Sequence, residues 1–356
     1  MLKLQKDVAS AVANEIHIQV TAEERRRLAS ARNVNPQAHE AYLLGQYHLR
    51  KNNERDMNQA VEYFKRAIQI APDYAPAYTG LSDTLLQQGW VARTGEIYKG
   101  VESQSRAAAL KAVALDEQLA EAHNSLGRIK LLYDWDWIGA EQEFRQALKF
   151  DPGSVEAHIS YGHLLGFLGR HAEAIREGHT AVQLDPVSST IQSSMGHILF
   201  RARKYEEALT YQQRAVELEP RNAEAYFRLG DLFVQVGGFD QALAAFRQVG
   251  ELTPEFESFR AGIAHVYALT GRQREPRQII NRLKADPMSI AAVYVALGDK
   301  NAAFMTLEQA AKERSPTLVS IKVAPAFDSL HSDPRWQSLL RRMNFSRGVA
   351  SRIGLQ

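Results

Sequence analysis

Apolar and small side chains recur along this chain in a pattern that repeats about every 34 residues. The period is marked by Pro152, Pro186, Pro220, Pro254 and Pro287, whose intervals are 34, 34, 34 and 33 residues. The clearest copy of the pattern contains Tyr226, Leu229, Gly230, Phe233, Ala242 and Phe246 before its closing proline. Spacings of three, four and seven residues place side chains on one face of an α-helix. Because proline cannot continue a helix, the pattern predicts pairs of helices, each pair ending near a proline.

A 34-residue period built from these residue types resembles the tetratricopeptide repeat (TPR), a helix–turn–helix unit. The resemblance implies an all-α fold, a TPR-type α-solenoid in which helical hairpins stack into a right-handed superhelix. Its small residues have a geometric reason, because Gly or Ala at a helix crossing allows the two axes to approach closely. Leu, Tyr and Phe would then fill the wider spaces between units.

About eight units are predicted between residues 38 and 320, and two of them depart from the pattern. The second unit carries about eleven extra residues, which we place in the turn at 90–103. The unit that opens with Ile263 has Pro276 in place of a second-helix alanine. These substitutions predict irregular geometry in both units.

The two ends of the chain are predicted to differ from the array. Residues 1–37 are predicted as N-terminal lead-in helices, with a capping box at residues 21–24. Residues 321–345 are predicted as a C-terminal capping helix, because the end unit of a solenoid would otherwise expose apolar surface. Residues 346–356 are predicted as a flexible tail.

The stretch YDWDW at residues 133–137 alternates two carboxylates with two indoles, an arrangement that invites a catalytic interpretation. In the repeat it occupies the turn between the two helices of the third unit, which has one extra residue. Asp136, or less favourably Asp134, is placed to cap the following helix. Trp135 and Trp137 are expected to close the turn over the helix ends. A short turn supplies no substrate-shaped walls and no split of carboxyl pKa values, so we interpret it as scaffold.

Longer stretches resemble the C-terminal sensor regions of bacterial multidomain regulators. The stretches are residues 34–49, 71–83, 114–148, 168–175 and 322–343. In that group a similar array follows a winged-helix DNA-binding domain, a serine/threonine kinase or an adenylate cyclase. The resemblance implies a regulatory or sensor part of a signalling or transcription protein. It also implies that the chain is an excised fragment, an isolated domain or a stand-alone relative.

Composition narrows the function classes. The 43 basic and 41 acidic side chains leave a net charge of +2, so no global field attracts nucleic acid or an anionic membrane. The absence of cysteine excludes disulfides and thiolate chemistry. The sequence shows neither a signal peptide nor an apolar run long enough for a membrane span. We expect a soluble cytoplasmic protein without nucleic-acid or membrane partners. A periplasmic location is the alternative if the array comes from a membrane-anchored parent.

The first helices of the units are expected to line a concave groove. One inward position reads Gln46, Asp83, Arg128, His163, His197, Asp231 and His265 in successive units, and neighbouring positions add Asn124, Phe200 and Phe227. A polar wall with apolar spots suits a peptide or a helix, whereas the alternative interpretation is that these side chains are merely solvated. The candidate partner-binding residues are Asn124, Arg128, His163, His197, Phe200, Phe227, Asp231 and His265.

No catalytic residue, cofactor or metal site is predicted. Equivalent positions in neighbouring units should lie roughly 10 Å apart, whereas zinc ligands bind at about 2 Å, so the groove histidines are not expected to share a metal. Chaperone-docking members of the wider family clamp a C-terminal carboxylate with a Lys/Asn/Arg set. Only Asn124 and Arg128 stand at comparable places here, which disfavours that activity. Phosphate-loop, dinucleotide, nucleophile-elbow and HExxH motifs are absent from the sequence.

The leading hypothesis is therefore a non-catalytic protein–protein interaction scaffold that binds a protein or peptide partner in its groove. The alternative hypothesis is a self-assembling TPR protein that mediates homo-oligomerisation. An enzyme is the third and least favoured class.

Overall fold

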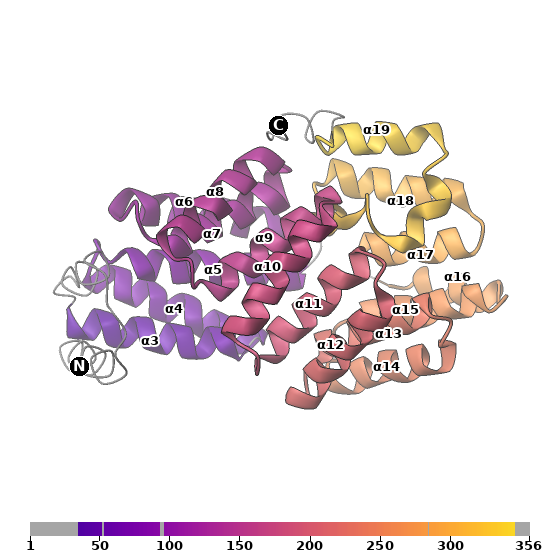
Figure 1. Ribbon diagram of the computed structural model, residues 1–356, viewed down its shortest axis with the longest axis horizontal. Helices are drawn as coiled ribbons and strands as arrows, with labels where there is room; N and C mark the ends of the chain where they lie inside the picture. Colours follow the sequence, from indigo (N-terminus) through magenta and orange to yellow (C-terminus); the bar gives the residue numbers. More distant parts are fainter. Residues whose placement is uncertain (1–34, 52, 93–95, 284, 346–356) are drawn as a thin grey trace.

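The computed structural model describes residues 35–51, 53–92, 96–283 and 285–345, and this part of the chain contains helices and no strands (Figure 1). The predicted all-α fold of stacked helical hairpins is confirmed. Two sequence predictions lie outside the described residues. They are the lead-in helix with its capping box at residues 21–24, and the tail at 346–356.

Consecutive helices pair as hairpins, and eight hairpins follow one another in the described part of the chain. They are α3 Pro36–Arg50 with α4 Glu54–Ile70, α5 Ala75–Ala92 with α6 Glu96–Leu115, α7 Ala120–Ile129 with α8 Trp137–Phe150, α9 Val155–Leu168 with α10 His171–Leu184, α11 Ser189–Arg201 with α12 Tyr205–Leu218, α13 Ala223–Gln235 with α14 Phe239–Leu252, α15 Ser258–Leu269 with α16 Arg274–Ile280, and α17 Pro287–Ala296 with α18 Lys300–Lys312. The first helices of successive hairpins contact one another along the whole stack. They therefore form one continuous wall.

Small residues allow the two helices of a hairpin to approach, as the repeat pattern predicts. The second-helix alanines Ala60, Ala140, Ala174, Ala208 and Ala242 are all completely buried. In the sixth hairpin, a Cβ atom on Gly230 would lie 2.6 Å from the ring of Phe246. The phenyl ring of the second helix therefore fills the space that a side chain on the first helix would need.

The eleven-residue insertion of the second unit lengthens its helices instead of forming a long turn. α5 and α6 contain 18 and 20 residues, whereas α9 and α10 contain 14 each. The single extra residue of the third unit is accommodated differently. It is absorbed in a π-helix, η1 Lys130–Asp134, which ends at Trp135 with a left-handed backbone (φ 51°).

The seventh hairpin is irregular, in agreement with the proline that interrupts its pattern. α16 has only seven residues, and Pro276 lies in its first turn, where a missing N–H removes no intrahelical hydrogen bond. Pro287 begins α17 and does not close the preceding hairpin, a difference from the sequence interpretation. At the first helical position a proline loses no intrahelical bond, and the Asp286 side chain caps the same helix by accepting from the Ser289 N–H.

The YDWDW turn is a structural element with a partner for each of its carboxylates. The predicted cap is confirmed, because Asp136 accepts from the Gly139 N–H at 2.9 Å at the start of α8. Asp134 instead binds the Arg106 guanidinium through both oxygens, at 2.7 and 2.9 Å. Both indoles of the turn are buried, each with 2% of its surface exposed. These contacts agree with the scaffold interpretation.

The C-terminal segment packs against the middle of the array, not only against the last hairpin. After α18 the chain forms two 3-10 turns, η2 Pro316–Ser320 and η3 Pro325–Leu330, and the short helix α19 Pro334–Arg342. A single hydrophobic cluster contains Trp137, Phe144, Leu165, Phe304, Leu318, Trp336 and Met343. Figure 1 shows the yellow C-terminal segment returning to the region of α8 and α9.

We call this packing of the C-terminal segment against the middle of the array closure, and it includes a hydrogen bond and a ring stack at the YDWDW turn. The Trp137 indole N–H donates to the Met343 carbonyl at 2.8 Å, across 206 residues of sequence, and its rings stack on Phe345 with centroids 4.2 Å apart. Lys322 and Arg203 add polar links, to the Leu168 carbonyl and to Asp328 respectively. The stack is thus closed by contacts that a rod of hairpins would not make.

Candidate functional site: the wall of first helices

At the N-terminal part of the wall, the predicted arginine is already ion-paired. Arg128 on α7 lies 3.2 Å from Asp83 on α5, and the Ser125 hydroxyl donates to the same carboxylate at 2.8 Å. Burial raises the pKa of Asp83, and the charge of Arg128 and the Ser125 hydrogen bond oppose that change. Asn124 is 6% exposed, and its side-chain oxygen has no hydrogen-bond partner among the described residues. This region connects two neighbouring hairpins.

In the middle of the wall, two predicted histidines converge on one arginine. Arg201, the last residue of α11, donates to Nδ1 of His163 on α9 at 2.9 Å and to Nδ1 of His197 at 3.2 Å. Its guanidinium also stacks on the ring of Phe167, 4.2 Å from the centroid. The two imidazole centroids are 6.0 Å apart, closer than the roughly 10 Å expected from helix spacing. Both rings thus accept from one shared guanidinium.

The pKa of each of these histidines is held well below its ordinary value of 6.5. Burial is the largest cause, followed by the positive charges of Arg201 and Arg228; Arg128 contributes at His163. Each ring is therefore neutral near pH 7. Because an arginine can only donate, each Nδ1 must accept, which assigns the ring proton to Nε2.

Three of the predicted residues line one shallow depression between α11 and α13. The lining residues are Gly196, His197, Phe200, Gln212, Arg228, Asp231 and Leu232. Phe200 packs beside the ring of His197, with centroids 6.0 Å apart. By contrast, Phe227 packs into the hydrophobic contact with Phe246 and Phe256. Phe200 is therefore the aromatic group of the depression, and Phe227 supports the wall behind it.

His265 lies on α15, where it shares no described hydrogen bond or ring contact with the other two histidines. Burial lowers its pKa to about 4. In the described part of the chain, no group of three or more His, Asp or Glu side chains is arranged to hold a metal ion. The eight predicted residues thus divide into an ion-paired region with Asn124 and Arg128, a depression beside the histidine pair, and two separate residues, Phe227 and His265.

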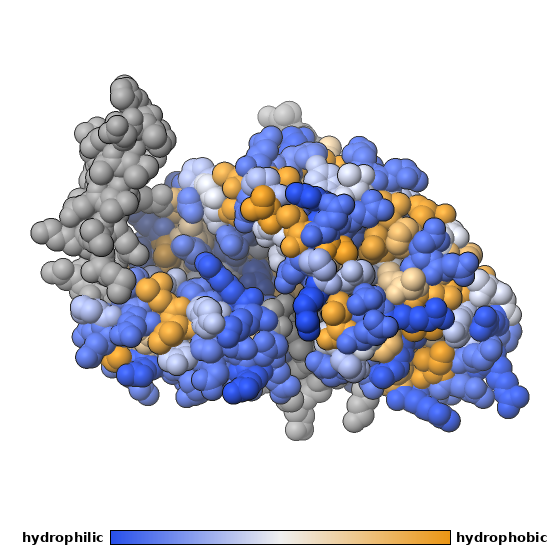
Figure 2. Space-filling view, turned by 90° about the horizontal axis from the view of Figure 1, so that it is seen from below, coloured by the Kyte–Doolittle hydropathy of each residue, from blue (hydrophilic) through white to orange (hydrophobic). Residues whose placement is uncertain are grey.

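Sequence reasoning missed Arg201 and Arg228, which give the middle of the wall its charge. Arg201 follows His197 by four residues on the same helix, so their shared face was visible in the sequence. Its contact with His163 on the previous first helix, however, depends on how the hairpins stack. Figure 2 shows one face of the molecule, with a recess bordered by hydrophilic residues and with apolar residues in separate small groups.

A larger open hollow lies elsewhere, beside the irregular α16. It has a volume of about 530 Å³ and is lined by Glu257, Arg260, Glu275, Gln278, Ile279, Arg282 and Leu283. None of the predicted groove residues borders it.

In the described residues, no helix combines the length and the hydrophobicity that crossing a membrane requires.

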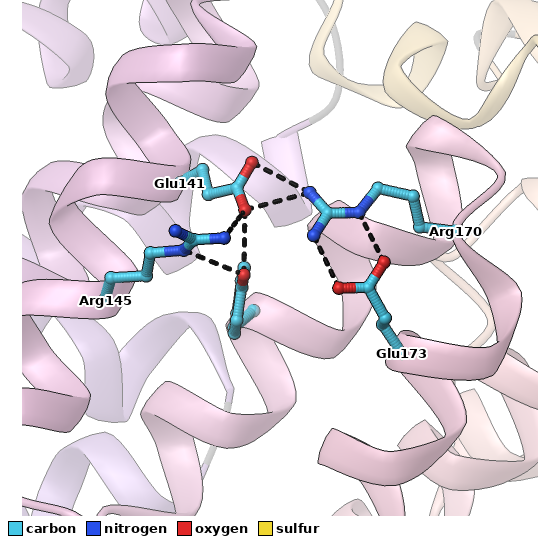
Figure 3. Close-up of polar contacts among 5 residues, drawn as sticks. Glu141, Arg145, Arg170 and Glu173 are labelled. Atoms are coloured by element: carbon cyan, nitrogen blue, oxygen red, sulfur yellow. Dashed lines mark hydrogen bonds and ion pairs between the residues drawn. The ribbon is translucent and has the colours of Figure 1, made fainter. Parts of the chain in front are cut away.

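A second polar cluster joins the third and fourth hairpins away from the depression (Figure 3). Glu141 on α8 accepts from Arg170 through both oxygens, at 2.8 and 2.9 Å, and from Arg145 and the Tyr161 hydroxyl, each at 2.8 Å. Arg170 also binds Glu173 on α10. Because only 5% of the Glu141 side chain is exposed, this carboxylate is the buried centre of the cluster.

The comparisons with known proteins identify the repeat. Family models described as tetratricopeptide repeat match residues 41–74, which include most of α3 and α4, and residues 187–254, which include α11 to α14. The matched repeats and the stacked hairpins together show an all-α TPR solenoid. TPR repeats indicate a protein–protein interaction scaffold. No curated protein sequence matches this chain significantly.

Several solved structures are similar to this chain at low identity. A TPR protein of Thermus thermophilus is 17% identical, with 55% of this chain and 99% of that chain covered and a TM-score of 0.47. PilF of Pseudomonas aeruginosa is 17% identical, with 68% and 95% covered and a TM-score of 0.40. YrrB, described as a TPR protein with an unusual peptide-binding site, is 20% identical, with 56% and 98% covered and a TM-score of 0.36.

The histidines of the wall lead to a pH prediction. A base whose pKa is lower in the folded state binds fewer protons there than in the unfolded chain, so acid favours unfolding. For His265 the loss begins below the ordinary pKa of 6.5 and continues toward about 4. We expect His265 to account for about 1 to 2 kcal/mol of lost unfolding free energy between pH 6.5 and pH 5, because the limit is about 1.4 kcal/mol per pH unit. Urea denaturation at several pH values measures this.

The variant His265→Gln should flatten the pH profile by that amount. His123 provides a control of opposite sign, because its hydrogen bond with Glu143 raises its pKa. Protonated His123 stabilises the fold at pH values below 6.5, and this contribution is lost as the pH rises through the folded-state pKa of His123. His123→Gln should therefore steepen the loss on acidification. Equal slopes in the two variants would contradict the assignment.

Proposed function

We propose that this chain is a non-catalytic interaction scaffold that binds a protein or peptide partner on its wall of first helices, as the regulatory or sensor part of a bacterial signalling or transcription regulator. The observation that carries the binding proposal is the depression between α11 and α13, where His197, Phe200 and Asp231 meet Arg228. An aromatic side chain beside convergent polar groups suits a peptide segment. The regulatory role is supported by the sequence stretches that resemble bacterial multidomain regulators, at residues 34–49, 71–83, 114–148, 168–175 and 322–343.

Site-specific photocrosslinking tests the binding proposal. A benzoylphenylalanine at position 200 keeps an aromatic group in the depression, and one at position 213 stands on the exposed outer face of α12. In cells of the bacterium that encodes the chain, we expect a discrete adduct from position 200 and none from position 213. Identical adduct patterns at both positions would argue against binding at this wall.

The oligomerisation alternative is favoured by one observation on α3. Leu43, Leu44 and Tyr47 are 41, 37 and 57% exposed, which places three large apolar groups on the surface of the first described hairpin. Size-exclusion chromatography with light scattering distinguishes the two functions. A monomer at micromolar concentration would count against self-assembly and leave the scaffold proposal intact.

A further inference from the structure

One position in the first helices binds the turn that precedes each helix. Its side chain donates to the carbonyl of the residue six places earlier, in the turn that joins two hairpins. In the described part of the chain these pairs are Tyr78 with the Pro72 carbonyl at 3.1 Å, His123 with Glu117 at 3.0 Å, His158 with Pro152 at 3.0 Å, and Gln192 with Pro186 at 2.7 Å. The position therefore ties successive hairpins together. Two of these four side chains are histidines, which gain or lose a proton near neutral pH.

The two histidines also reach the second helix of their own hairpin. Nδ1 of His123 lies 2.7 Å from a carboxylate oxygen of Glu143 on α8. In the same way, Nδ1 of His158 lies 2.6 Å from a carboxylate oxygen of Glu177 on α10. Each histidine thus joins three segments, which are its own first helix, the turn before that helix and the second helix after it.

Both contacts of each ring require a bound proton. A backbone carbonyl and an ionised carboxylate can only accept, so Nδ1 and Nε2 must both carry hydrogen. A neutral imidazole has a single N–H group, and only the imidazolium ion makes both bonds at once. These rings therefore differ from His163 and His197, whose Nδ1 atoms accept from Arg201.

The groups around His123 favour the imidazolium form. The hydrogen bond with Glu143 is the largest cause and raises the pKa of His123. Burial opposes this rise, the Glu117 carbonyl supports it, and the Lys130 ammonium on η1 opposes it. Lys130 itself binds Glu143 at 2.7 Å. The net effect is a pKa above the ordinary value of 6.5.

The groups around His158 act in the same direction. The hydrogen bond with Glu177 is the largest cause and raises the pKa of His158. Burial opposes the rise, whereas the Pro152 carbonyl and the charge of Asp151 support it. A base whose pKa is higher in the folded state stabilises the fold below its unfolded pKa, and this contribution is lost as the pH rises through the folded pKa. Alkaline pH should therefore weaken both junctions.

We propose that His123 and His158 are proton-dependent joints on the two sides of the third hairpin. With its bound proton, each ring holds both the turn before its helix and the second helix after it. When the ring loses this proton, one of the two bonds is lost, and the third hairpin is held less tightly to its neighbours. The same hairpin carries the YDWDW turn, where Trp137 donates to Met343, so pH acts on the hairpin that receives the C-terminal segment. The inference concerns the array itself and does not depend on partner binding.

The protonation state is tested with the full chain labelled with ¹⁵N-histidine. We expect NMR spectra at pH 6 to show a proton on both ring nitrogens of His123 and His158, and both rings to titrate above pH 6.5. The variants His123→Gln and His158→Gln assign the two sets of signals. A ring with a single N–H group at pH 6, or a titration at or below pH 6.5, would overturn the joint at that position.

Amide hydrogen exchange measures how tightly each junction is held, and the chain contains its own control. The amides of Leu119 and Ser154 donate within the two histidine-bound turns, and the Tyr74 amide donates at the same place in the turn bound by Tyr78. After correction for the intrinsic rate, protection of Leu119 and Ser154 should fall about three- to tenfold as the pH rises through the histidine pKa, as expected for the loss of one hydrogen bond. Protection of Tyr74 should stay constant. An equal fall at all three amides, or constant protection at all three, would overturn the proposal.

Substitutions separate the proton from the bond. Gln192 binds the carbonyl of its turn as a neutral side chain, so His158→Gln should keep the turn in place. Exchange at Ser154 should then lose its pH dependence, while exchange at Leu119 keeps it and reports an intact fold. Glu177→Gln should lower the pKa of His158 and move the fall in protection to lower pH, because it removes the largest cause of the raised pKa. A pH dependence at Ser154 that is unchanged in both variants would show that His158 is not the joint.

Discussion

Glu141→Gln should lower the free energy of unfolding by about 3 kcal/mol, because breaking a buried ion pair leaves an uncompensated charge. The Glu141 carboxylate accepts from Arg170 through both oxygens and from Arg145 and Tyr161, with 5% of its side chain exposed. The amide retains the shape of the carboxylate but removes the negative charge shared by the two arginines. Urea denaturation followed by circular dichroism measures the change.

The same cluster contains a matched control. Glu173 binds the other side of the Arg170 guanidinium, at 2.6 and 2.7 Å, but 40% of its side chain is exposed. Glu173→Gln should cost less than about 1 kcal/mol, because solvent already screens an exposed pair. A loss as large as that of Glu141→Gln would show that burial does not determine the strength of this cluster.

The cluster connects hairpins in a way that the repeat pattern does not. Glu141 belongs to α8, whereas Tyr161 and Arg170 belong to the next hairpin. The alanines and glycines of the repeat determine how closely two helices pack, but they do not determine which polar groups meet across the gap. The ion-pair cluster therefore adds specificity to one particular junction.

The sequence predicted the features that depend on nearest neighbours. The 34-residue period predicted hairpins of helices, and the cap at Asp136 followed from the position of the turn. Both depend on residues within one unit or in adjacent units. The eleven-residue insertion was located in the correct unit but was interpreted as a longer turn, whereas it lengthens α5 and α6. The number of extra residues alone does not distinguish a longer helix from a longer turn.

Features that depend on accumulated curvature could not be predicted. The rotation between successive hairpins determines whether the C-terminal segment meets an earlier hairpin, and small changes per repeat sum over the stack. The apolar residues of the last segment indicated a covering role, but they did not indicate that Met343 would meet Trp137. The same limit applies to the candidate site, where Arg201 contacts His163 from the neighbouring hairpin.

Closure changes how the array should respond to unfolding. In an open solenoid each repeat contacts only its neighbours, so terminal repeats can unfold separately. Here the hydrophobic cluster that contains Trp137 also contains Phe304, Trp336 and Met343 from the last hairpin and the final helix. Unfolding of the C-terminal segment would therefore expose part of the third hairpin, and the two regions should unfold together.

Trp137→Ala should lower the free energy of unfolding by about 3 to 5 kcal/mol, the range for removal of a large buried aromatic side chain. The indole is 2% exposed, donates to the Met343 carbonyl and stacks on Phe345. The next residue on α8, Ile138, is 40% exposed and provides the control. Ile138→Ala should cost less than about 1 kcal/mol, as is usual for surface substitutions.

A truncated chain shows how much of that loss belongs to closure. Removing residues 334–356 deletes α19, Met343 and Phe345, and so removes the partners of the indole. In this background Trp137→Ala should cost at least about 1 kcal/mol less than in the full chain, because residues in contact have non-additive effects of about 0.5 to 3 kcal/mol. The double-mutant cycle is measured by urea denaturation. An equal loss in both backgrounds would mean that Trp137 stabilises only its own hairpin, and that the C-terminal segment docks without energetic coupling to the turn.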